Sequence, residues 1–454
     1  MLRDYQESAI SEILKFEKLR QLLHLPTGAG KTVVFCEIIK RLPSLKSLVV
    51  VHGKSLIEQA SERLSREGIE HGVIMGDHAG RDDSKKVQVC SVDTLSRRNL
   101  SPPADLIVID EAHQATTNSY HKFLSNYEDK KILAVTATPF TEKPLSHLAE
   151  KVISPTTVKK LTEEGYLAPL KYYSPSEPDL ANVGIRGMDY EHESLANEMN
   201  RPHLIGSILH EYLKHADGTP TLIFAVNIAH AIAIKENFAS LNKRVSLVTA
   251  DTPLHVRREY INEKGIIVNV GVFSTGIDIP HLKTIILARP TKSYNLYIQM
   301  LGRGTRPSPG KSHCLVLDHS GNVKTHGFID DERKIFLGKK KEPVEQTFIS
   351  TCKKCFAVFY VNEKCPLCGT KNEQVEKERK LKRVDGVLTE IIELSEIDKA
   401  RIYLNQLKKE RKERGHKRGW VFYKMKDKFP EWIVEELCPK RVIPDWVRMK
   451  YIKK

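Results

Sequence analysis

Long apolar runs are absent from this sequence of 454 residues. A helix that crosses a bilayer needs about 18 or more consecutive apolar residues, and no stretch approaches that length. The opening residues Met1–Gln6 are mostly polar and charged, unlike the apolar centre of a secretory signal. We therefore expect a cytoplasmic protein without a membrane partner.

Acidic residues are scarce relative to basic ones. The chain contains 57 Asp and Glu against 72 Lys and Arg, which gives a formal net charge of +15. An excess of this size indicates a polyanionic partner, although net charge alone does not separate nucleic acid from a membrane surface. The excess is uneven, because residues 399–454 hold 18 Lys or Arg and 7 Asp or Glu.

Cysteine is also scarce, and half of the eight cysteines fall in one short segment. Two CxxC pairs supply the four thiols Cys352, Cys355, Cys365 and Cys368. In a reducing compartment this spacing favours a metal site over disulfides. Four thiolates leave no open position on a tetrahedral Zn²⁺, so we expect a structural zinc ribbon at residues 345–373. An iron–sulfur cluster uses the same ligands and stays an alternative.

Two segments of the chain share one pattern of short apolar runs separated by helical stretches. Such runs predict parallel strands that are covered on both faces. The expected strands are 21–25, 47–52, 87–91, 106–109 and 132–136, then 221–226, 245–249, 265–270, 284–288 and 313–318. We therefore expect an α/β fold with two tandem parallel-sheet domains, at residues 1–165 and 201–335. Residues 166–200, rich in Tyr, Pro, Ser and Gly, are expected to form a linker.

A glycine-rich turn follows the first expected strand and precedes a helical pattern. Its residues are Thr27, Gly28, Ala29, Gly30, Lys31 and Thr32. Backbone N–H groups in such a turn close around phosphate oxygens, and the helix N-terminus adds partial positive charge. Lys31 is expected to reach the β- and γ-phosphates of a nucleotide, and Thr32 to ligate Mg²⁺. Leu25 stands where the strict pattern has its first glycine, and an ordinary strand-to-helix turn is the alternative.

The apolar run 106–109 ends in two carboxylates, Asp110 and Glu111. A buried strand that delivers carboxylates to its carboxyl end places them where open α/β sheets bind ligands. We expect Asp110 to hold Mg²⁺ and Glu111 to orient or deprotonate an attacking water. A plain acidic helix start is the alternative, because carboxylates also stabilise helix N-termini.

Together these motifs resemble those of DEAH-type superfamily 2 helicases, whose order they follow across residues 1 to about 320. The resemblance implies two RecA-like domains with ATP and Mg²⁺ between them. It assigns further nucleotide contacts to Arg3, Gln6, Gly276 and Asp278. It assigns nucleic-acid contacts to His52, Gly53, Thr94, Asn227 and Thr275. It assigns the coupling of the two sites to His113, Thr136, Thr138 and Gln299.

The segment 299–306 resembles the arginine-finger motif of the same family. Arg303 and Arg306 lie three positions apart, which is about one helical turn, so both can point into one cleft. Their planar, permanently charged side chains suit a transferring γ-phosphoryl group. A contact to the phosphate backbone or a surface pair is the alternative.

The last part of the chain, residues 380–454, combines basic residues with aromatic ones. We expect a mainly helical region with a charged helix at 399–418, followed by Trp420, Tyr423 and Phe429 interleaved with lysines. Lysines neutralise phosphates and aromatic rings stack on bases, which suits nucleic acid. A small helical domain with an aromatic core and a solvated basic face is an equally good interpretation, and the two are compatible.

The order of helicase core, four-cysteine knuckle and basic tail resembles the RadD-type branch, which is bacterial or phage-encoded and acts in DNA repair and recombination. The resemblance implies an ATP-hydrolysing DNA helicase, associated with the nucleoid, that acts on single-stranded or branched DNA beside DNA-repair proteins. One alternative is an RNA helicase. Another is a DNA-stimulated translocase that does not separate strands. A restriction motor and a binding scaffold with a silent ATP site are further alternatives. The sequence shows no separate nuclease module, and the intact Lys31 and Asp110 argue against the scaffold.

Overall fold

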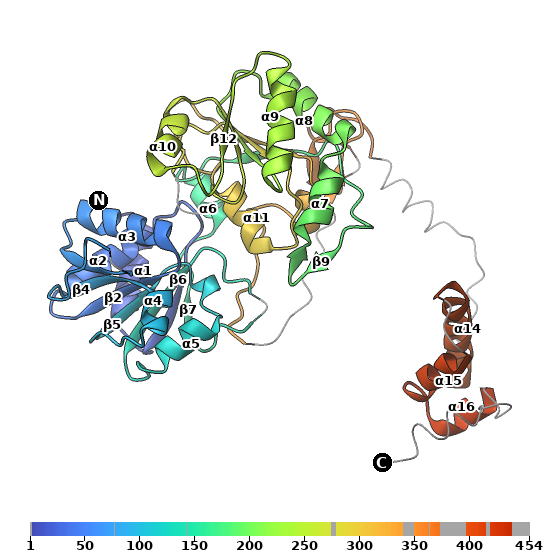
Figure 1. Cartoon of the computed structure of the whole chain (residues 1–454), viewed down its shortest axis with the longest axis horizontal. Helices are drawn as coiled ribbons and strands as arrows, with labels where there is room; N and C mark the ends of the chain where they lie inside the picture. The colour runs from blue at the N-terminus through green and yellow to red at the C-terminus, as the bar shows by residue number, and fades with distance from the viewer. Residues whose placement is uncertain are drawn as a thin grey trace. The chain divides into compact units, whose positions relative to one another are not determined.

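The computed structural model describes residues 2–76, 78–141, 143–273, 278–338, 349–362, 364–372, 396–414 and 418–437. Residues up to Glu378 belong to one compact unit, and residues from Arg379 onward belong to a second. The first unit contains two large parallel sheets (Figure 1). Among the described residues, no helix combines the length and the apolar content that crossing a bilayer requires.

The first sheet has seven parallel strands in the order β3-β4-β2-β5-β6-β1-β7. Their bounds are β1 Arg20–His24, β2 Ser47–Val51, β3 His71–Ile74, β4 Val87–Ser91, β5 Leu106–Ile109, β6 Lys131–Thr136 and β7 Lys151–Ile153. Successive side chains such as Leu22 and Leu23 enter opposite cores, because side chains alternate along a strand. Both faces are covered, which explains why the strands appear in the sequence as continuous apolar runs.

Helices cover both faces of the first sheet. One hydrophobic core joins the sheet to α1 Asp4–Leu14, α2 Lys31–Arg41 and α3 Lys54–Arg66. The opposite core joins it to α4 Val92–Arg97 and α5 Asn118–Leu124. The 3-10 helix η1 spans Ala112–Gln114, and α6 spans Val158–Glu163. The five strands expected from the sequence are confirmed to within one residue at each end.

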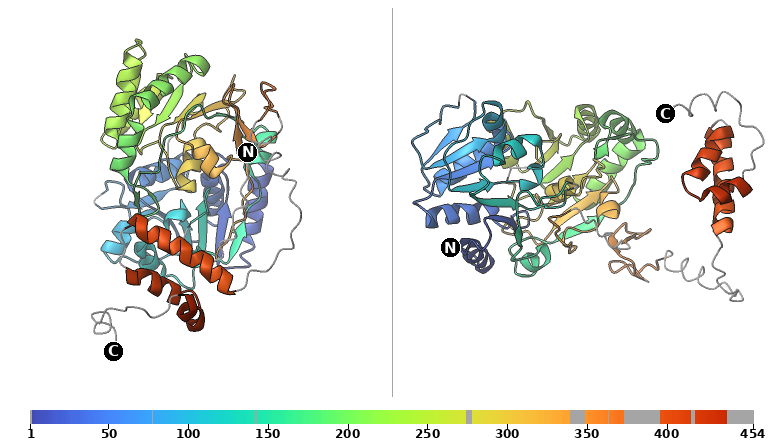
Figure 2. Two further views of the ribbon diagram at one scale, coloured as in Figure 1. Left: turned by 90° about the vertical axis from the view of Figure 1, so that its right-hand side faces the viewer. Right: turned by 90° about the horizontal axis from the view of Figure 1, so that it is seen from below.

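The second sheet has six parallel strands in the order β12-β13-β11-β14-β15-β8. Their bounds are β8 Leu170–Tyr173, β11 Thr221–Phe224, β12 Val245–Val248, β13 Ile266–Asn269, β14 Thr284–Leu287 and β15 Cys314–Asp318. The helices are α7 His192–Met199, α8 Pro202–His215, α9 Ile228–Ala239, α10 Leu254–Asn262, α11 Tyr294–Leu301 and α12 Asn322–His326. One core of this sheet includes α8 and α9, which lie side by side, and the other includes α10, α11 and α12 (Figures 1 and 2).

Residues 166–200, which the composition predicts to be a linker, contain regular structure. Their first strand, β8, is the edge strand of the second sheet and pairs with β15. A small hairpin follows, formed by β9 Ile185–Arg186 and β10 Asp189–Tyr190, and then α7 begins. The sequence pattern misses these strands, and β3 and β7 as well, because each is short and interrupted by polar residues or glycine, so that no continuous apolar run results.

A second small hairpin carries the first two cysteines and extends the edge of the second sheet. Its strands are β16 Ile349–Thr351 and β17 Val358–Tyr360. Tyr173 of β8 forms a bridge with Ala357, and the backbone N–H of Ser174 donates to the carbonyl of Phe356 at 3.0 Å. The cysteine segment is therefore attached to β8.

The second unit consists of helices in the part that the structure describes. They are α14 Glu396–Arg414, α15 Arg418–Lys426 and α16 Glu431–Leu437. They enclose a hydrophobic core of their own, in which Leu404, Met425 and Ile433 are buried. Figure 2 shows α14 as the long helix against which α15 and α16 pack. The predicted mainly helical region is confirmed here, whereas Trp446 and the other residues after Leu437 lie outside the described residues.

Candidate active site

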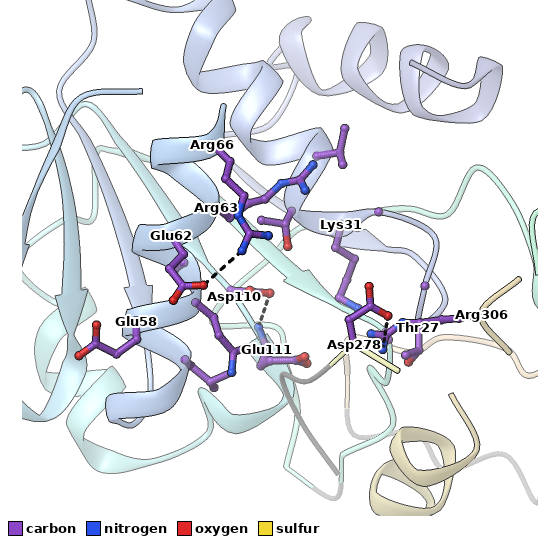
Figure 3. A pocket seen from close by; sticks show the side chains of 18 of the residues that line it. Thr27, Lys31, Glu58, Glu62, Arg63, Arg66, Asp110, Glu111, Asp278 and Arg306 are labelled. Atoms are coloured by element: carbon purple, nitrogen blue, oxygen red, sulfur yellow. Dashed lines mark hydrogen bonds and ion pairs between the residues drawn. The ribbon is translucent and has the colours of Figure 1, made fainter. Parts of the chain in front are cut away.

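The motif residues of both sheets line one cavity of about 1520 Å³. The first sheet and its flanking helices contribute Arg3, Gln6, Thr27, Gly28, Gly30, Lys31, Thr32, Asp110 and Glu111. The second contributes Asp278, Gln299, Arg303 and Arg306. Figure 3 shows Lys31 and Thr27 from one side close to Asp278 and Arg306 from the other. The structure thus brings together residues that lie almost 300 positions apart in the sequence.

The backbone of the phosphate loop requires glycine at two positions. Gly28 and Gly30 have φ values of 86° and 83°, in the left-handed region that most side chains avoid. A Cβ atom on Gly30 would also lie 2.5 Å from Nε2 of Gln6. Glycine has no side chain with which to cap α2, and uncapped N–H groups in a first helical turn bind anions. The loop therefore has the geometry of a phosphate cradle, with Lys31 as the first residue of α2.

Helix α1 supports this loop from behind. The Gln6 Oε1 atom accepts from the backbone N–H of Arg3 at 3.0 Å, and Gln6 Nε2 donates to the carbonyl of Ala29 at 3.0 Å. The hydroxyl of Tyr5 donates to the same carbonyl at 2.8 Å, and the Arg3 guanidinium lies 4.3 Å from the ring centroid of Tyr166. The sequence motif pointed to Arg3 and Gln6. It missed Tyr5 and Tyr166, because no motif marks a supporting aromatic ring.

The two carboxylates stand at the carboxyl end of β5, as expected. Asp110 is partly buried, and desolvation raises its pKa to about 6, helped by the charge of Glu111 and opposed by Lys31. Glu111 has a φ of 49°, so the chain turns sharply directly after the strand, and its N–H donates to Asp110 Oδ1 at 2.9 Å. The Asp110 carboxylate and the Thr32 hydroxyl line the same cavity, and oxygen donors of this kind fit Mg²⁺.

The four predicted coupling residues form one cluster around His113. Its Nδ1 atom lies 3.1 Å from Oγ1 of Thr136 and 3.3 Å from Oγ1 of Thr138, and its Nε2 atom lies 3.2 Å from Nε2 of Gln299. Burial lowers the pKa of His113, which favours the neutral ring. An amide nitrogen only donates, so the Gln299 contact makes His113 Nε2 the acceptor and places the ring proton on Nδ1. Glu111 Oε2 lies 3.4 Å from that Nδ1.

The two arginines follow α11 and are held tightly. Arg303 is 4% exposed, and burial together with neighbouring Arg306 lowers its pKa to about 9. Arg306 forms an ion pair of 2.9 Å with Asp278, which the family resemblance assigns to the nucleotide. Lys311 donates to the carbonyls of Gly304 and Arg306 at 2.7 Å each, which fixes the turn between the arginines. The sequence gave no signal for Lys311, because a lone lysine in a loop matches no motif.

The arginine segment touches the phosphate loop directly. A Cβ atom on Gly302 would lie 2.5 Å from Cγ2 of Thr27, and one on Gly304 would lie 2.7 Å from Sγ of Cys314. Glycine at both positions therefore allows the turn to pack between the two sheets. The two sheet domains also contact each other through an ion pair of 2.8 Å between Arg258 of α10 and Glu62 of α3.

The residues expected to contact nucleic acid lie at the carboxyl ends of other strands. His52 follows β2, and its Nδ1 atom lies 3.4 Å from a carboxylate oxygen of Asp93 in α4. The hydroxyl of Thr94 accepts from the N–H of Gly76 at 3.3 Å. Asn227, after β11, caps α9 by accepting from the N–H of His230 at 2.9 Å.

Thr275, expected to contact nucleic acid, and Gly276, expected to contact the nucleotide, lie outside the described residues. Gly53 has a φ of 87° and directly precedes α3. Its left-handed backbone explains the glycine, since other residues are strained there.

The four clustered cysteines converge on one point. Their Sγ atoms all lie within 4.8 Å of one another, and the pairs Cys352–Cys368 and Cys355–Cys365 are 3.5 Å and 3.7 Å apart. Thiolates at about 2.3 Å from a tetrahedral Zn²⁺ are separated by about 3.8 Å, so the cluster fits a single ion. The residues after the second cysteine of each pair, Phe356 and Gly369, share a positive φ, of 58° and 71°. The two knuckles therefore have matching turns.

Comparison with known families finds matches to two segments of the chain. Residues 1–141 match the family "Type III restriction enzyme, res subunit", and residues 205–308 match "Helicase conserved C-terminal domain". The chain is 31% identical over 358 residues to "Putative ATP-dependent helicase IRC3" of Saccharomyces cerevisiae, covering 71% of this chain and 52% of the yeast protein. It is 27% identical over 415 residues to a "51.5 kDa protein" of a Lactococcus phage, covering 88% and 87% of the two chains. The chain thus spans about half the length of the yeast relative.

Solved structures show the same fold. A fragment of a putative HsdR subunit of a type I restriction enzyme from Vibrio vulnificus superposes with a TM-score of 0.58 at 22% identity, over 72% of this chain and 67% of that one. The restriction-modification enzyme LlaBIII bound to DNA gives 0.53 at 17% identity, over 70% of this chain and 27% of that one. At such identities the likeness concerns the fold, which is two tandem RecA-like sheets.

Proposed function

We propose that this chain, which carries both domains of the superfamily 2 helicase core, is an ATP-hydrolysing motor that moves along DNA. The observation that carries the proposal is the single cavity that unites the phosphate loop, the acidic pair and the two arginines. A nucleotide bound there contacts both sheets at once. Binding and hydrolysis would therefore change how the two sheets are held together, which is what a motor requires.

The residues divide the chemistry among themselves. The phosphate loop and Lys31 hold the nucleotide phosphates, and Gln6 lies at the edge of the cavity, where its amide has further capacity for the adenine. Glu111 orients the attacking water, and Arg303 and Arg306 neutralise charge on the γ-phosphoryl group during transfer. Thr32 and Asp110 would hold Mg²⁺, and the ion would supply positive charge to the nucleotide phosphates. Arg306 would have to exchange Asp278 for the phosphate as it engages.

The cluster around His113 is proposed to carry the signal between the sites. It connects Glu111 beside the hydrolytic water to Thr136 and Thr138 at the end of β6, and to Gln299 of the second sheet. A change in the position of either sheet must break or remake the Gln299 contact. Nucleic acid bound along His52, Thr94 and Asn227 could then alter the geometry around Glu111 through this cluster.

DNA, rather than RNA, is proposed as the track. The basic excess of the last 56 residues suits a polyanion, and the order of core, four-cysteine knuckle and basic helical unit resembles the RadD-type branch. On that basis we infer a structural Zn²⁺ at the cysteine cluster and a role in DNA repair or recombination. The similar proteins include "ATP-dependent DNA helicase uvsW" of phage T4, which is 25% identical over 340 residues.

The first test is the steady-state rate of ATP hydrolysis without nucleic acid and with single-stranded, duplex and forked DNA and with RNA, each at two salt concentrations. We expect the largest stimulation with a DNA form, and a weaker effect at higher salt, because salt competes for phosphate contacts. The Lys31→Ala protein is the control for contaminating hydrolases. Stimulation by RNA alone would assign the track to RNA, and a rate indifferent to every nucleic acid would refute the proposed motor.

A further inference from the structure

The small hairpin formed by β9 and β10 exposes two apolar side chains. Ile185 is 60% exposed and Met188 is 58% exposed, which places them among the most exposed large apolar residues that the structure describes. The turn between the strands consists of Gly187 and Met188, and Gly187 has a φ of 66°. Glycine at the first position of a two-residue hairpin turn matches the twist of the strands, so the tip has a defined shape.

The hairpin is fixed to the second sheet. Both carboxylate oxygens of Asp189 accept hydrogen bonds from the segment that connects β14 to α11: one from the hydroxyl of Thr291 and one from the N–H of Lys292, at 2.7 Å each. The ammonium group of Lys292 lies 5.1 Å from the ring centroid of Tyr190. An isolated two-stranded hairpin is marginally stable in water, and these contacts compensate for that.

The hairpin is attached to the second-sheet domain next to two predicted functional segments. Tyr190 packs in a small core with residues of α7 and with Val226, which directly precedes Asn227, the expected nucleic-acid contact of the second sheet. The other attachment, Thr291 and Lys292, directly precedes α11, which leads to the two arginines. Figure 1 shows β9 beside α7 in the second-sheet domain. The hairpin is thus attached to two segments, one that leads to Asn227 and one that leads to α11.

We propose that the hairpin at residues 185–190 separates the strands of a duplex, with Ile185 and Met188 stacking against the terminal base pair at a junction. The inference rests on the proposed function and deepens it, because a motor that moves along one strand separates a duplex only if a fixed element blocks the other strand. Apolar side chains such as Ile and Met insert between base steps and unstack them. Arg186 and Lys292 supply positive charge for the adjacent phosphates.

The test uses the full-length protein with Ile185→Ser and Met188→Ser combined. Three activities are measured: ATP hydrolysis stimulated by single-stranded DNA, displacement of streptavidin from single strands biotinylated at either end, and displacement of a labelled strand from a fork. We expect strand displacement to fall about tenfold or more, because unstacking is no longer assisted. Hydrolysis and streptavidin displacement should stay within about twofold, because the tip touches neither the nucleotide nor the single strand's phosphates.

Two control proteins make the result specific. The Ile232→Ser, Leu241→Ser protein removes two other exposed apolar side chains, at 41% and 49% exposure, on and just after α9, and should behave as the wild type. The Ile185→Leu, Met188→Leu protein keeps the apolar tip and should retain strand displacement. Unchanged strand displacement in the serine variant would overturn the proposal and leave a partner protein as the occupant of the tip. A wild type that displaces streptavidin but opens no fork would also overturn it, while the proposed motor would stand.

Discussion

The two sheets have the same parallel architecture, yet they contribute different kinds of group to the cavity. The first sheet offers a binding surface shaped by backbone, in which Gly28 and Gly30 take left-handed conformations and Lys31 begins α2. The second sheet offers cations that are already buried. Arg303 is 4% exposed, and Lys311 fixes the turn that carries it through two carbonyl contacts.

This difference suggests that binding and hydrolysis are separable in this molecule. In the proposed mechanism, groups on the first sheet would meet the phosphates whatever the position of the second sheet. The arginines would reach the γ-phosphoryl group only when the second sheet is docked as it is here, with Gly302 against Thr27. Burial lowers the pKa of Arg303, so keeping its guanidinium charged in this position carries a free-energy cost. An anionic γ-phosphate would offset that cost.

The largest effects are expected when one cation is removed from each sheet, which tests whether the first sheet binds the nucleotide and the second promotes its hydrolysis. We expect Arg303→Ala to lower the single-turnover rate of ATP hydrolysis by about 10³-fold or more, as for other arginine fingers, and to leave nucleotide affinity within about tenfold. Lys31→Ala should lose both affinity and turnover. Fluorescent-nucleotide titration and rapid-quench kinetics measure the two quantities.

A conservative variant and a folding control accompany this pair. Arg303→Lys keeps the charge but loses the planar fork, so its rate should lie between those of the wild type and Arg303→Ala. Thermal unfolding excludes a general loss of structure. If Arg303→Ala weakened nucleotide binding as strongly as Lys31→Ala does, the division of labour between the sheets would be wrong.

The contact between His113 and Gln299 joins the two sheets. Breaking it should weaken the stimulation of ATP hydrolysis by DNA. We expect His113→Ala and Gln299→Ala each to reduce stimulation by DNA about 5- to 100-fold, the usual range for coupled sites, while unstimulated hydrolysis persists. The double variant should lose little more than either single variant, because both remove the same contact. Hydrolysis rates with and without saturating DNA measure the effect.

Thr138→Ser serves as the matched control for that cluster, since it keeps the hydroxyl near His113 Nδ1. Its stimulation should stay close to that of the wild type. Effects of His113→Ala and Gln299→Ala that simply add would show that the residues act separately, and the 3.2 Å contact would then have no role in coupling.

Much of the fold could be predicted from the sequence because both sheets are buried on two faces. Strands such as β2 and β5 appear as unbroken apolar runs, and their ends carry the motif residues. The β9–β10 hairpin and β8 gave no such signal, since two- to four-residue strands with exposed side chains have no periodicity to detect. The stretch 166–200 therefore looked like a linker.

The candidate site was readable in part for a related reason. Motifs identified Lys31, Asp110 and Arg303 as single residues, but the contacts that hold them depend on chain segments that meet only after folding. The contact between Nε2 of Gln299 and Nε2 of His113 joins residues 186 positions apart. Lys311 reaches the carbonyls of Gly304 and Arg306, only seven and five residues earlier, but its loop matches no motif. The pairing of Arg306 with Asp278 was equally invisible, because the resemblance assigned each residue to the nucleotide instead.

The smallest expected effect concerns the sheet edges. The outer edge of β8 is covered by the cysteine hairpin through Ser174 and Phe356, and β7 at the edge of the first sheet has no comparable metal segment among the described residues. The Zn²⁺ proposed at the cysteine cluster would supply folding free energy to this short segment. Removing the metal with a chelator should therefore raise amide exchange in residues 170–174 about five- to tenfold, as expected for the loss of roughly one backbone hydrogen bond, and leave β7 unchanged.

Hydrogen–deuterium exchange of the full chain, with zinc content measured by elemental mass spectrometry, checks this prediction. The Cys355→Ser protein should show the fast exchange without chelator and no further response to it. Equal exchange of residues 170–174 in the metal-loaded and metal-free proteins would mean that β8 is held by β15 alone. In that case the cysteine segment would be an appendage of the second sheet, and the two sheets would differ only in what they bring to the cavity.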